Sequence, residues 1–219
     1  ITKAEVSHAL CDKRLAEELQ NALPGCSSLK EVRYWYDDAP DSLDELVLKQ
    51  PLTYGNVPTA LDDPALIAFT SGTTGKPKGV QRDTGGYAVA LASSMKHIFL
   101  GKPGETYFST SDIGWVVGHS YIVYGPLIAG MATILYEGLP IRPDAGIWWS
   151  LVERFKVTSM FSAPTAVRVL KKQDPAFLKK YDLSSLRALF LAGEPLDEPT
   201  AKWIADSLGR PIIDNYWQT

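Results

Sequence analysis

One ten-residue stretch combines residue types that could bind a chain of phosphates. Residues 70–79 read Thr-Ser-Gly-Thr-Thr-Gly-Lys-Pro-Lys-Gly and follow directly on the apolar run 65–69. The three glycines allow tight turns in which successive backbone N–H groups converge on an anion. Four hydroxyls add further donors, and Lys76 and Lys78 supply positive charge. This combination predicts a polyphosphate-binding loop.

Two other interpretations of this stretch have to be weighed. A Walker A loop has four residues between its glycines and ends in Lys-Ser or Lys-Thr, whereas here two residues separate Gly72 from Gly75 and Pro77 follows Lys76. A flexible surface linker has a similar Gly, Ser and Thr composition. We expect the strand before the loop to be buried, and this position together with the paired lysines favours an anion-binding loop over a linker.

The elements that must position this loop form a regular alternation from Leu66 onward. Short apolar runs occupy 65–69, 106–109, 132–136, 157–161, 186–191 and 211–213, and helical patterns occupy 86–99, 145–156, 165–173 and 197–208. Strands that alternate with helices imply crossover connections, so we expect an α/β fold with a mostly parallel sheet flanked by helices. In the last helix, Asp197 is the candidate N-cap, Pro199 lies in the first turn and Gly209 follows the end.

The residues before this alternation differ in character. Residues 1–36 carry a helical pattern at 12–23 and a strand candidate at 32–36, and we interpret them as the end of a preceding α/β unit. Residues 37–64 are acidic and rich in proline and turn formers, which predicts a connecting segment. The main α/β subdomain is then 65–219.

Composition excludes several classes of protein. The chain has 219 residues, of which 45% are hydrophobic and 21% charged, as in folded globular proteins. A net charge of −3 argues against a partner of nucleic acid, and no apolar run is long enough for a membrane span. Two cysteines, Cys11 and Cys26, cannot build a disulfide framework, and they share no metal-ligand spacing with the three histidines. We therefore expect a cytoplasmic protein.

Four blocks together resemble a known family. Residues 70–79 resemble the phosphate-loop signature of the AMP-forming acyl-CoA synthetases, a branch of the adenylate-forming enzymes. In the same order follow 112–121, similar to the acyl-pocket segment of acetyl- and propionyl-CoA synthetases, 193–195, similar to the adenine-contacting turn, and 214–219, similar to the nucleotide motif. The resemblance covers 65–219 and, more weakly, the preceding residues. Within the family, the blocks are most similar to propionate–CoA ligases.

The resemblance implies a reaction in two halves and assigns residues to it. A carboxylate attacks the α-phosphate of ATP to give an acyl-adenylate and pyrophosphate, and the thiol of CoA then displaces AMP, with Mg²⁺ and cationic groups stabilising the charge. The implied phosphate contacts are Thr70, Ser71, Gly72, Thr73, Thr74, Gly75, Lys76 and Lys78. The implied adenine, ribose and α-phosphate contacts are Gly193, Glu194, Pro195, Asp214, Asn215, Tyr216, Trp217, Gln218 and Thr219. The candidate catalytic residues are Lys76, Lys78 and Thr219.

The resemblance also implies an acyl pocket formed by Val116, Val117, Ala192 and Trp217. Acetate enzymes typically carry valine where this chain has Ala192, and the smaller side chain leaves room for about one methylene, worth ~1–3 kcal/mol of discrimination. Val117 stands where those enzymes usually carry threonine, which makes the pocket more apolar. Propionate is therefore the expected substrate, although ordinary core packing is the alternative explanation of Ala192.

For three further polar residues, the sequence allows two interpretations each. Arg82 and Arg168 are candidate anion contacts, with packed or solvated positions as the equal alternative. His119 either orients substrate or forms a hydrogen bond within the chain. We do not assign it as a general base, because the attacking carboxylate is already ionised at neutral pH.

Whole enzymes of this family are longer than this chain. We therefore expect the chain to be an incomplete part of the large N-terminal domain of an adenylate-forming enzyme. The expected C-terminal domain and the glutamate that helps to hold Mg²⁺ have no counterpart, so we expect no metal ligand in this chain and no activity of the chain alone. The expected partners are a small carboxylate, CoA and the remainder of the enzyme. The alternatives are an acetyl-CoA synthetase, another adenylating ligase, or a nucleotide-binding module without turnover.

Overall fold

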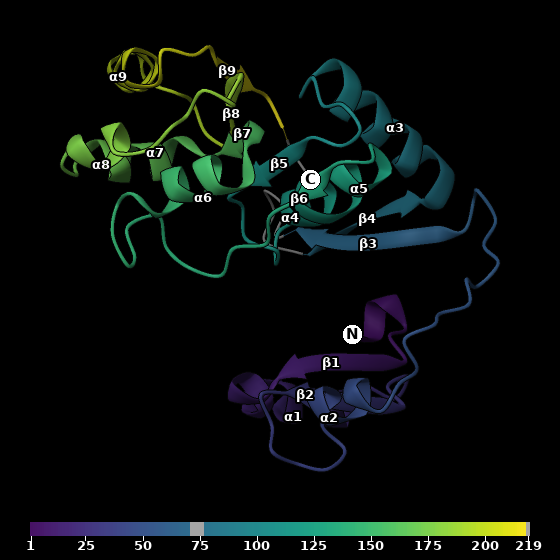
Figure 1. The fold of residues 1–219 in the computed structure, drawn as a ribbon. Helices are drawn as coiled ribbons and strands as arrows, with labels where there is room; N and C mark the ends of the chain where they lie inside the picture. Colours follow the sequence, from purple (N-terminus) through teal and green to yellow (C-terminus); the bar gives the residue numbers. More distant parts are fainter. Residues whose placement is uncertain (71–76, 218–219) are drawn as a thin grey trace. The chain divides into compact units, whose positions relative to one another are not determined.

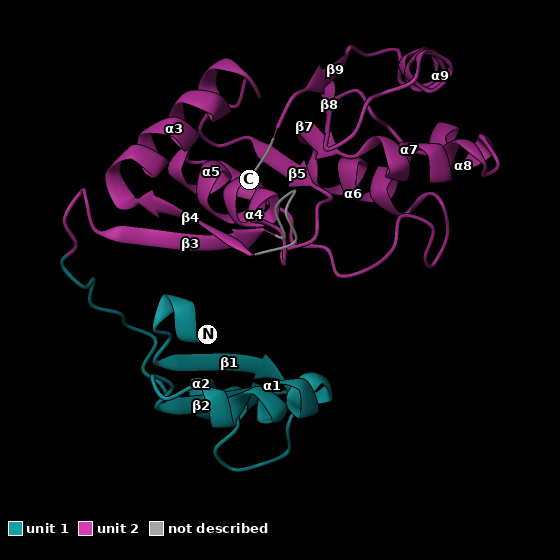
Figure 2. Cartoon of the chain, turned by 180° about the vertical axis from the view of Figure 1, so that it is seen from behind, with its two compact units in different colours: residues 1–58 teal, residues 59–219 magenta. Residues whose placement is uncertain are grey.

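The computed structural model describes residues 1–70 and 77–217 and divides the chain into two compact units, Ile1–Pro58 and Thr59–Thr219 (Figure 2). In the first unit, β1 (His8–Asp12) and β2 (Glu31–Trp35) form a parallel pair. The helices of this unit are α1 (Ala16–Ala22), α2 (Leu43–Leu48) and the 3₁₀ turns Thr2–Ala4, Lys13–Leu15 and Leu23–Gly25. The predicted helix 12–23 is therefore a short α-helix between two 3₁₀ turns.

Helix α2 lies inside the stretch 37–64, for which the sequence predicts a connecting segment. Ser42 caps this helix by accepting a hydrogen bond from the backbone N–H of Glu45 at 3.3 Å, and two acidic residues occupy its first turn. Asp44 also accepts from the backbone N–H of Tyr36 at 2.8 Å, which ties α2 to the end of β2. These local contacts extend the first compact unit to Pro58.

A five-stranded parallel sheet forms the centre of the second unit (Figure 1). Its strand order is β6-β5-β7-β8-β9, and the strands are β5 (Thr106–Ser109), β6 (Ala132–Thr133), β7 (Val157–Ser162), β8 (Ala188–Ala192) and β9 (Ile212–Asn215). All four neighbouring pairs run parallel. This arrangement confirms the predicted mostly parallel α/β sheet, although only two residues of the run 132–136 are in a strand.

Helices cover both faces of this sheet, and every residue of its inner strand β8 is buried. Leu189 and Leu191 of β8 belong to a core cluster with α6 (Ile147–Phe155), α7 (Pro164–Lys171) and α9 (Glu198–Leu208). Their neighbours Phe190 and Ala192 belong to a second cluster, with α3 (Thr84–His97). The remaining helices are α4 (Val116–Gly118), the π-helical turn His119–Tyr124, α5 (Gly125–Ile128) and α8 (Ala176–Lys179). None of the described helices has both the length and the apolar character that crossing a membrane requires.

The expectation of a buried strand at 65–69 is wrong. β3 (Pro64–Thr70) instead pairs antiparallel with β4 (Lys78–Asp83) in a separate two-stranded sheet. Along β3, Ala68 is buried, whereas Ile67 and Phe69 are 41% and 44% exposed. Both strands contact α3. The sequence did not indicate β4 because its residues are mostly polar. The predicted phosphate loop begins in β3 at Thr70 and includes Lys78 and Gly79 of β4.

The predicted boundaries of the last helix are confirmed. The carboxylate of Asp197 accepts a hydrogen bond from the backbone N–H of Thr200 at 3.0 Å, as an N-cap residue does. Pro199 lies in the first turn, and Gly209 ends the helix in the left-handed conformation with φ of +58°. Cap residues act through neighbouring backbone groups, and for this reason the helix ends could be recognised in the sequence.

Candidate functional site

A cavity of about 250 Å³ lies where three parallel strands of the second unit end. Its lining residues follow or end β5, β7 and β8 or come from α4, α7 and the end of the described chain: Thr110, Ser111, Trp115, Val117, Phe161, Ser162, Ala163, Ala166, Ala192, Gly193 and Trp217. Ligands of parallel α/β sheets bind at the carboxyl edge of the strands, so this is the candidate functional site.

Three of the four residues expected in an acyl pocket line this cavity. Ala192 is the buried last residue of β8, Val117 lies in α4, and Trp217 follows β9. The ring of Trp217 packs edge-on against Tyr121, with the ring centroids 6.3 Å apart. Val116 is half-buried at the start of α4 but is not among the lining residues. The side chains brought together are mainly apolar, as a short hydrocarbon chain requires.

A pair of hydroxyls on the same cavity was missed by the sequence reasoning. The Oγ1 of Thr110 donates a hydrogen bond to the Oγ of Ser162 at 2.7 Å, and both residues are lining residues. The backbone N–H of Thr110 also donates to the carbonyl of Phe161 at 2.9 Å, which holds the chain after β5 against β7. The signal available in the sequence was the position of each residue directly after an apolar run.

The segment that carries Val117 is held in place by a close approach at Gly118. A Cβ added to Gly118 would lie 2.3 Å from the backbone oxygen of Asp112, so only glycine fits without a shift of the main chain. The π-helical turn that follows is a geometry frequent at functional sites. Ser120 within it shares a 2.6 Å hydrogen bond with the hydroxyl of Tyr87 on α3. Helix α3 and the cavity wall are thereby connected.

His119 begins the π-helical turn and Arg82 lies in β4, and neither residue lines the cavity. The ring of His119 is half-buried, with its centroid 6.3 Å from that of Tyr124. The guanidinium of Arg82 stacks on the ring of Tyr87, 5.2 Å from its centroid, while its Nε atom is buried and has no hydrogen-bond partner among the described residues. The stack on Tyr87 agrees with the packed interpretation of Arg82, and the Nε atom, unpaired among the described residues, agrees with an anion contact.

The two segments expected to contact the nucleotide leave adjacent strands. Ala192 of β8 pairs with Asn215 of β9, so the Gly193 turn and the residues after Asn215 emerge side by side. Gly193 has φ of +101°, which a residue with a side chain adopts only under strain. The side-chain amide nitrogen of Asn215 is buried and has no hydrogen-bond partner among the described residues. Asp214 and Tyr216 are exposed, and Gln218 and Thr219 lie outside the described residues.

The expected phosphate contacts can be placed only at the two ends of their loop. Thr70 is the last residue of β3 and pairs with Lys78, the exposed first residue of β4. The other expected contacts, Ser71, Gly72, Thr73, Thr74, Gly75 and Lys76, lie outside the described residues.

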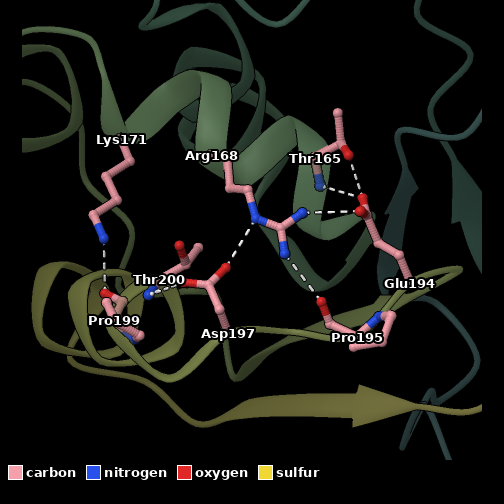
Figure 3. A network of polar contacts seen from close by, with 8 residues as sticks. All are labelled: Thr165, Arg168, Lys171, Glu194, Pro195, Asp197, Pro199 and Thr200. Atoms are coloured by element: carbon pink, nitrogen blue, oxygen red, sulfur yellow. Dashed lines mark hydrogen bonds and ion pairs between the residues drawn. The ribbon is translucent and has the colours of Figure 1, made fainter.

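Glu194 directs its carboxylate toward α7 (Figure 3). It accepts hydrogen bonds from the backbone N–H of Thr165 at 2.7 Å, from the Thr165 hydroxyl, and from Nη1 of Arg168 at 2.8 Å. The hydrogen bond from the Thr165 hydroxyl is the main reason that the pKa of Glu194 lies below its ordinary value; burial opposes this effect, and the hydrogen bond from Arg168 adds to it. Since the carboxylate is engaged by the protein, the parts of Glu194 left to contact a ligand are its backbone atoms.

Arg168 binds two carboxylates and one carbonyl of the same loop (Figure 3). Besides Glu194, its Nε donates to Asp197 at 2.8 Å and its Nη2 donates to the carbonyl of Pro195 at 3.0 Å. Hydrogen bonding by Thr200, with that of Arg168, lowers the pKa of Asp197 from 3.8 to about 2. Of the two interpretations left open by the sequence, the structure therefore supports the packed one for Arg168.

The described residues contain no group of three or more His, Cys, Asp or Glu side chains that could hold a metal ion. The acidic residues near the site, Glu194 and Asp197, are paired with Arg168. These two carboxylates are therefore engaged by the protein and are not free to coordinate a metal ion.

Comparison with known proteins gives concordant results. Residues 1–219 match the family described as AMP-binding enzyme. The chain is 62% identical to a propionate–CoA ligase of Salmonella typhimurium over 188 residues, which are 84% of this chain and 30% of that protein. It is 68% identical to a propionate–CoA ligase of Escherichia coli over 158 residues (72% of this chain and 25% of that protein). An acetyl-coenzyme A synthetase of Wolinella succinogenes is 44% identical over 165 residues (74% and 25%).

The fold is also shared with a solved structure. An acyl-CoA synthetase of Brucella canis superposes with a TM-score of 0.81 at 27% sequence identity, and the match covers 97% of this chain and 38% of that chain. The chain thus spans about a quarter to two fifths of the length of these relatives.

Proposed function

Since the chain belongs to the AMP-binding enzyme family, we propose that the complete protein is an AMP-forming short-chain acyl-CoA synthetase. In this reaction a carboxylate oxygen attacks the α-phosphate of ATP, pyrophosphate leaves, and an acyl-adenylate forms. The sulfur of CoA then attacks the acyl carbon, AMP leaves, and a thioester forms. The observation that carries the proposal is the small apolar cavity at the sheet edge where the Gly193 turn and the end of β9 meet.

We propose propionate as the carboxylate. A cavity of about 250 Å³ suits a chain of a few carbons, and its walls include the methyl group of Ala192, the isopropyl group of Val117 and the ring of Trp217. A larger side chain at position 192 would shorten the space by about one methylene. The high identity to two proteins named propionate–CoA ligase supports the same substrate.

ATP would lie across the ends of β8 and β9. The backbone of the Gly193–Pro195 turn and the buried amide of Asn215 would contact the adenine side, and Thr70 and Lys78 at the hairpin would face the β- and γ-phosphates. Lys78 would act by stabilising negative charge that develops on the departing pyrophosphate. Mg²⁺, the metal that the family resemblance implies, would supply further positive charge at the phosphates of ATP when bound, and no described residue is assigned to it.

The test is pyrophosphate release by the complete protein with ATP and, in turn, acetate, propionate and butyrate, with and without CoA. We expect release that depends on the carboxylate, with the highest kcat/KM for propionate, and formation of the thioester only when CoA is present. Release independent of any carboxylate would contradict the enzyme assignment. ATP binding without turnover would favour a nucleotide-binding module, and a preference for acetate would contradict the assignment of Ala192.

A further inference from the structure

One side chain contacts three residues of the connection between β8 and α9. The guanidinium of Arg168 contacts Glu194, Pro195 and Asp197, three residues within four positions of one another, over 2.8 to 3.0 Å (Figure 3). Arg168 lies 26 to 29 positions earlier in the chain, on α7. The connection between β8 and α9 is therefore fastened to a neighbouring helix as well as to its own two ends.

This contact joins two walls of the cavity. Helix α7 contributes Ala163, its N-cap, and Ala166, while the end of β8 contributes Ala192 and the connection contributes Gly193. Along the chain, α7 and the Gly193 turn are connected through β8 and the residues that precede it. A tether from α7 to the connection consequently sets how far the two walls stand apart and where the Gly193 backbone points.

We propose that Arg168 is a positioning residue for nucleotide and acyl binding, because it fixes the Gly193–Pro195 turn against α7. The proposal rests on the proposed function for the identity of the ligands. Isolated ion pairs at partly exposed positions contribute little to stability, and both Arg168 and its carboxylate partners are about a third or more exposed. Three directed hydrogen bonds from one rigid planar group instead restrict geometry, which is the property that a ligand-contacting turn needs.

The chain offers a matched control on the same helix. Lys171 lies one turn after Arg168, and its Nζ donates to the carbonyl of Pro199 at 2.9 Å. Lys171 thus ties α7 to the first turn of α9 and, among the described residues, forms no hydrogen bond with the Gly193–Pro195 turn (Figure 3). Loss of Lys171 removes one cation and one contact to α9 while leaving the tether to the turn in place.

The experiment compares Arg168→Met and Lys171→Met in the complete protein by hydrogen exchange of the backbone amides at 193–197 and by steady-state kinetics. We expect Arg168→Met to speed exchange there and to raise the KM for ATP and for the carboxylate, each by about tenfold or more. Lys171→Met should change neither quantity. Arg168→Lys should recover part of the loss, since an ammonium cannot reach all three partners at once.

Two results would overturn the proposal: unchanged exchange at 193–197 in Arg168→Met, or equal changes in both variants. The exchange measurement needs no ligand, so it tests the tether even if the protein proves not to activate carboxylates, whereas only the kinetic part depends on the proposed function. If Arg168→Met fails to fold, Asp197→Asn serves in its place, because asparagine can still cap α9 but loses the ionic contact with Arg168. It should speed exchange at 193–197 by a smaller factor, and no change there would contradict the tether.

Discussion

At the scale of single residues, the end of β8 concentrates the determinants of substrate size. Ala192 is buried in the core cluster that includes Phe190 and also borders the cavity, so its volume is limited from both sides. A methyl group at this position leaves space that a branched side chain would fill. Ordinary core packing and a substrate wall are therefore compatible explanations of the same alanine.

Replacement of Ala192 by valine should move the substrate preference toward acetate. The added methyl groups would occupy the space proposed for the terminal methyl of propionate, and we expect the ratio of kcat/KM for propionate to that for acetate to fall about tenfold or more. Ala188→Val is the control, because Ala188 lies on the same face of β8 at its opposite end and does not line the cavity. It can lower stability by overpacking but should leave the ratio unchanged. An equal change of the ratio in both variants would contradict the assignment of Ala192 to the acyl pocket.

Loss of the charge at Lys78 should slow adenylation. Lys78 is exposed at the start of β4 and makes no contact on which the fold depends among those described, so Lys78→Ala should keep the unfolding temperature. We expect the rate of pyrophosphate release to drop by ~10²-fold, the usual cost of one group that stabilises developing charge. Lys96→Ala on α3 removes a lysine that is likewise exposed and should have no effect. An unchanged rate in Lys78→Ala would exclude it from the phosphate site.

At the scale of elements, the ends of some helices can be recognised from cap residues in the sequence, whereas one helical segment has no such local signal. The N-cap, the proline and the terminal glycine define α9 within its own sequence. By contrast, α4, the π-helical turn and α5 follow one another over 116–128 with no break, and their geometry depends on contacts with Asp112 and Tyr87. Such contacts cannot be recognised in a local pattern.

A methyl group at Gly118 should therefore disturb this segment. Gly118→Ala would place a Cβ 2.3 Å from the backbone oxygen of Asp112 and 2.8 Å from the Cα of Ile113, neither of which can move aside as a side chain could. We expect the free energy of unfolding of the complete protein to fall by about 1–3 kcal/mol. Gly25→Ala is the control, since a Cβ there meets nothing within 4 Å. Equal stability of Gly118→Ala and the parent protein in denaturant titrations would refute this account.

The cap of α9 should make stability depend on pH in the acid range. The folded pKa of Asp197 is about 2, below its ordinary 3.8, so the carboxylate contributes fully above about pH 4 and its contribution disappears as the pH falls through about 2. Asp197→Asn keeps a capping oxygen but does not titrate. The unfolding temperature of the parent should exceed that of Asp197→Asn at about pH 6, and the difference should shrink toward about pH 2. A difference that stays constant over this range would show that Asp197 does not stabilise the fold as an ion.

At the scale of the whole molecule, the chain consists of two compact units joined near Pro58 and Thr59. Between α2 and β3 the residues form no helix or strand, and Leu52, Tyr54 and Val57 are exposed. Extended, exposed backbone is the preferred substrate of proteases. The two units should then survive as separate fragments after a first cut.

Brief digestion of the complete protein with chymotrypsin should cut first at 52–57. Tyr54 is the expected site, whereas the fully buried Tyr107 of β5 should be cut only after the second unit unfolds. Tyr54→Ser should slow the first cut, and mass spectrometry of the fragments identifies it. A first cut within the sheet would contradict the division into these two units.

The sequence by itself determined the local features of this protein. The glycines, hydroxyls and lysines of 70–79, the caps of α9 and the alternation of apolar runs with helical patterns each depend on residues close together in the chain. They were sufficient to predict the parallel sheet and the ends of one helix, whereas the family was inferred from the resemblance of four sequence blocks. The predicted strand at 65–69 shows the limit, because its partner β4 has too few apolar residues for its pattern to reveal a strand.

Only the tertiary structure decided which distant residues meet. The cavity is assembled from residues around 110–117, 161–166, 192–193 and 217, and the hydrogen bond between Thr110 and Ser162 spans 52 positions. Arg168 could equally have bound an anion or packed against the protein until its three partners on the β8–α9 connection were located. The physical reason is that parallel strands adjacent in a sheet are separated in sequence by their crossover helices, so contacts at the sheet edge leave no trace in local spacing.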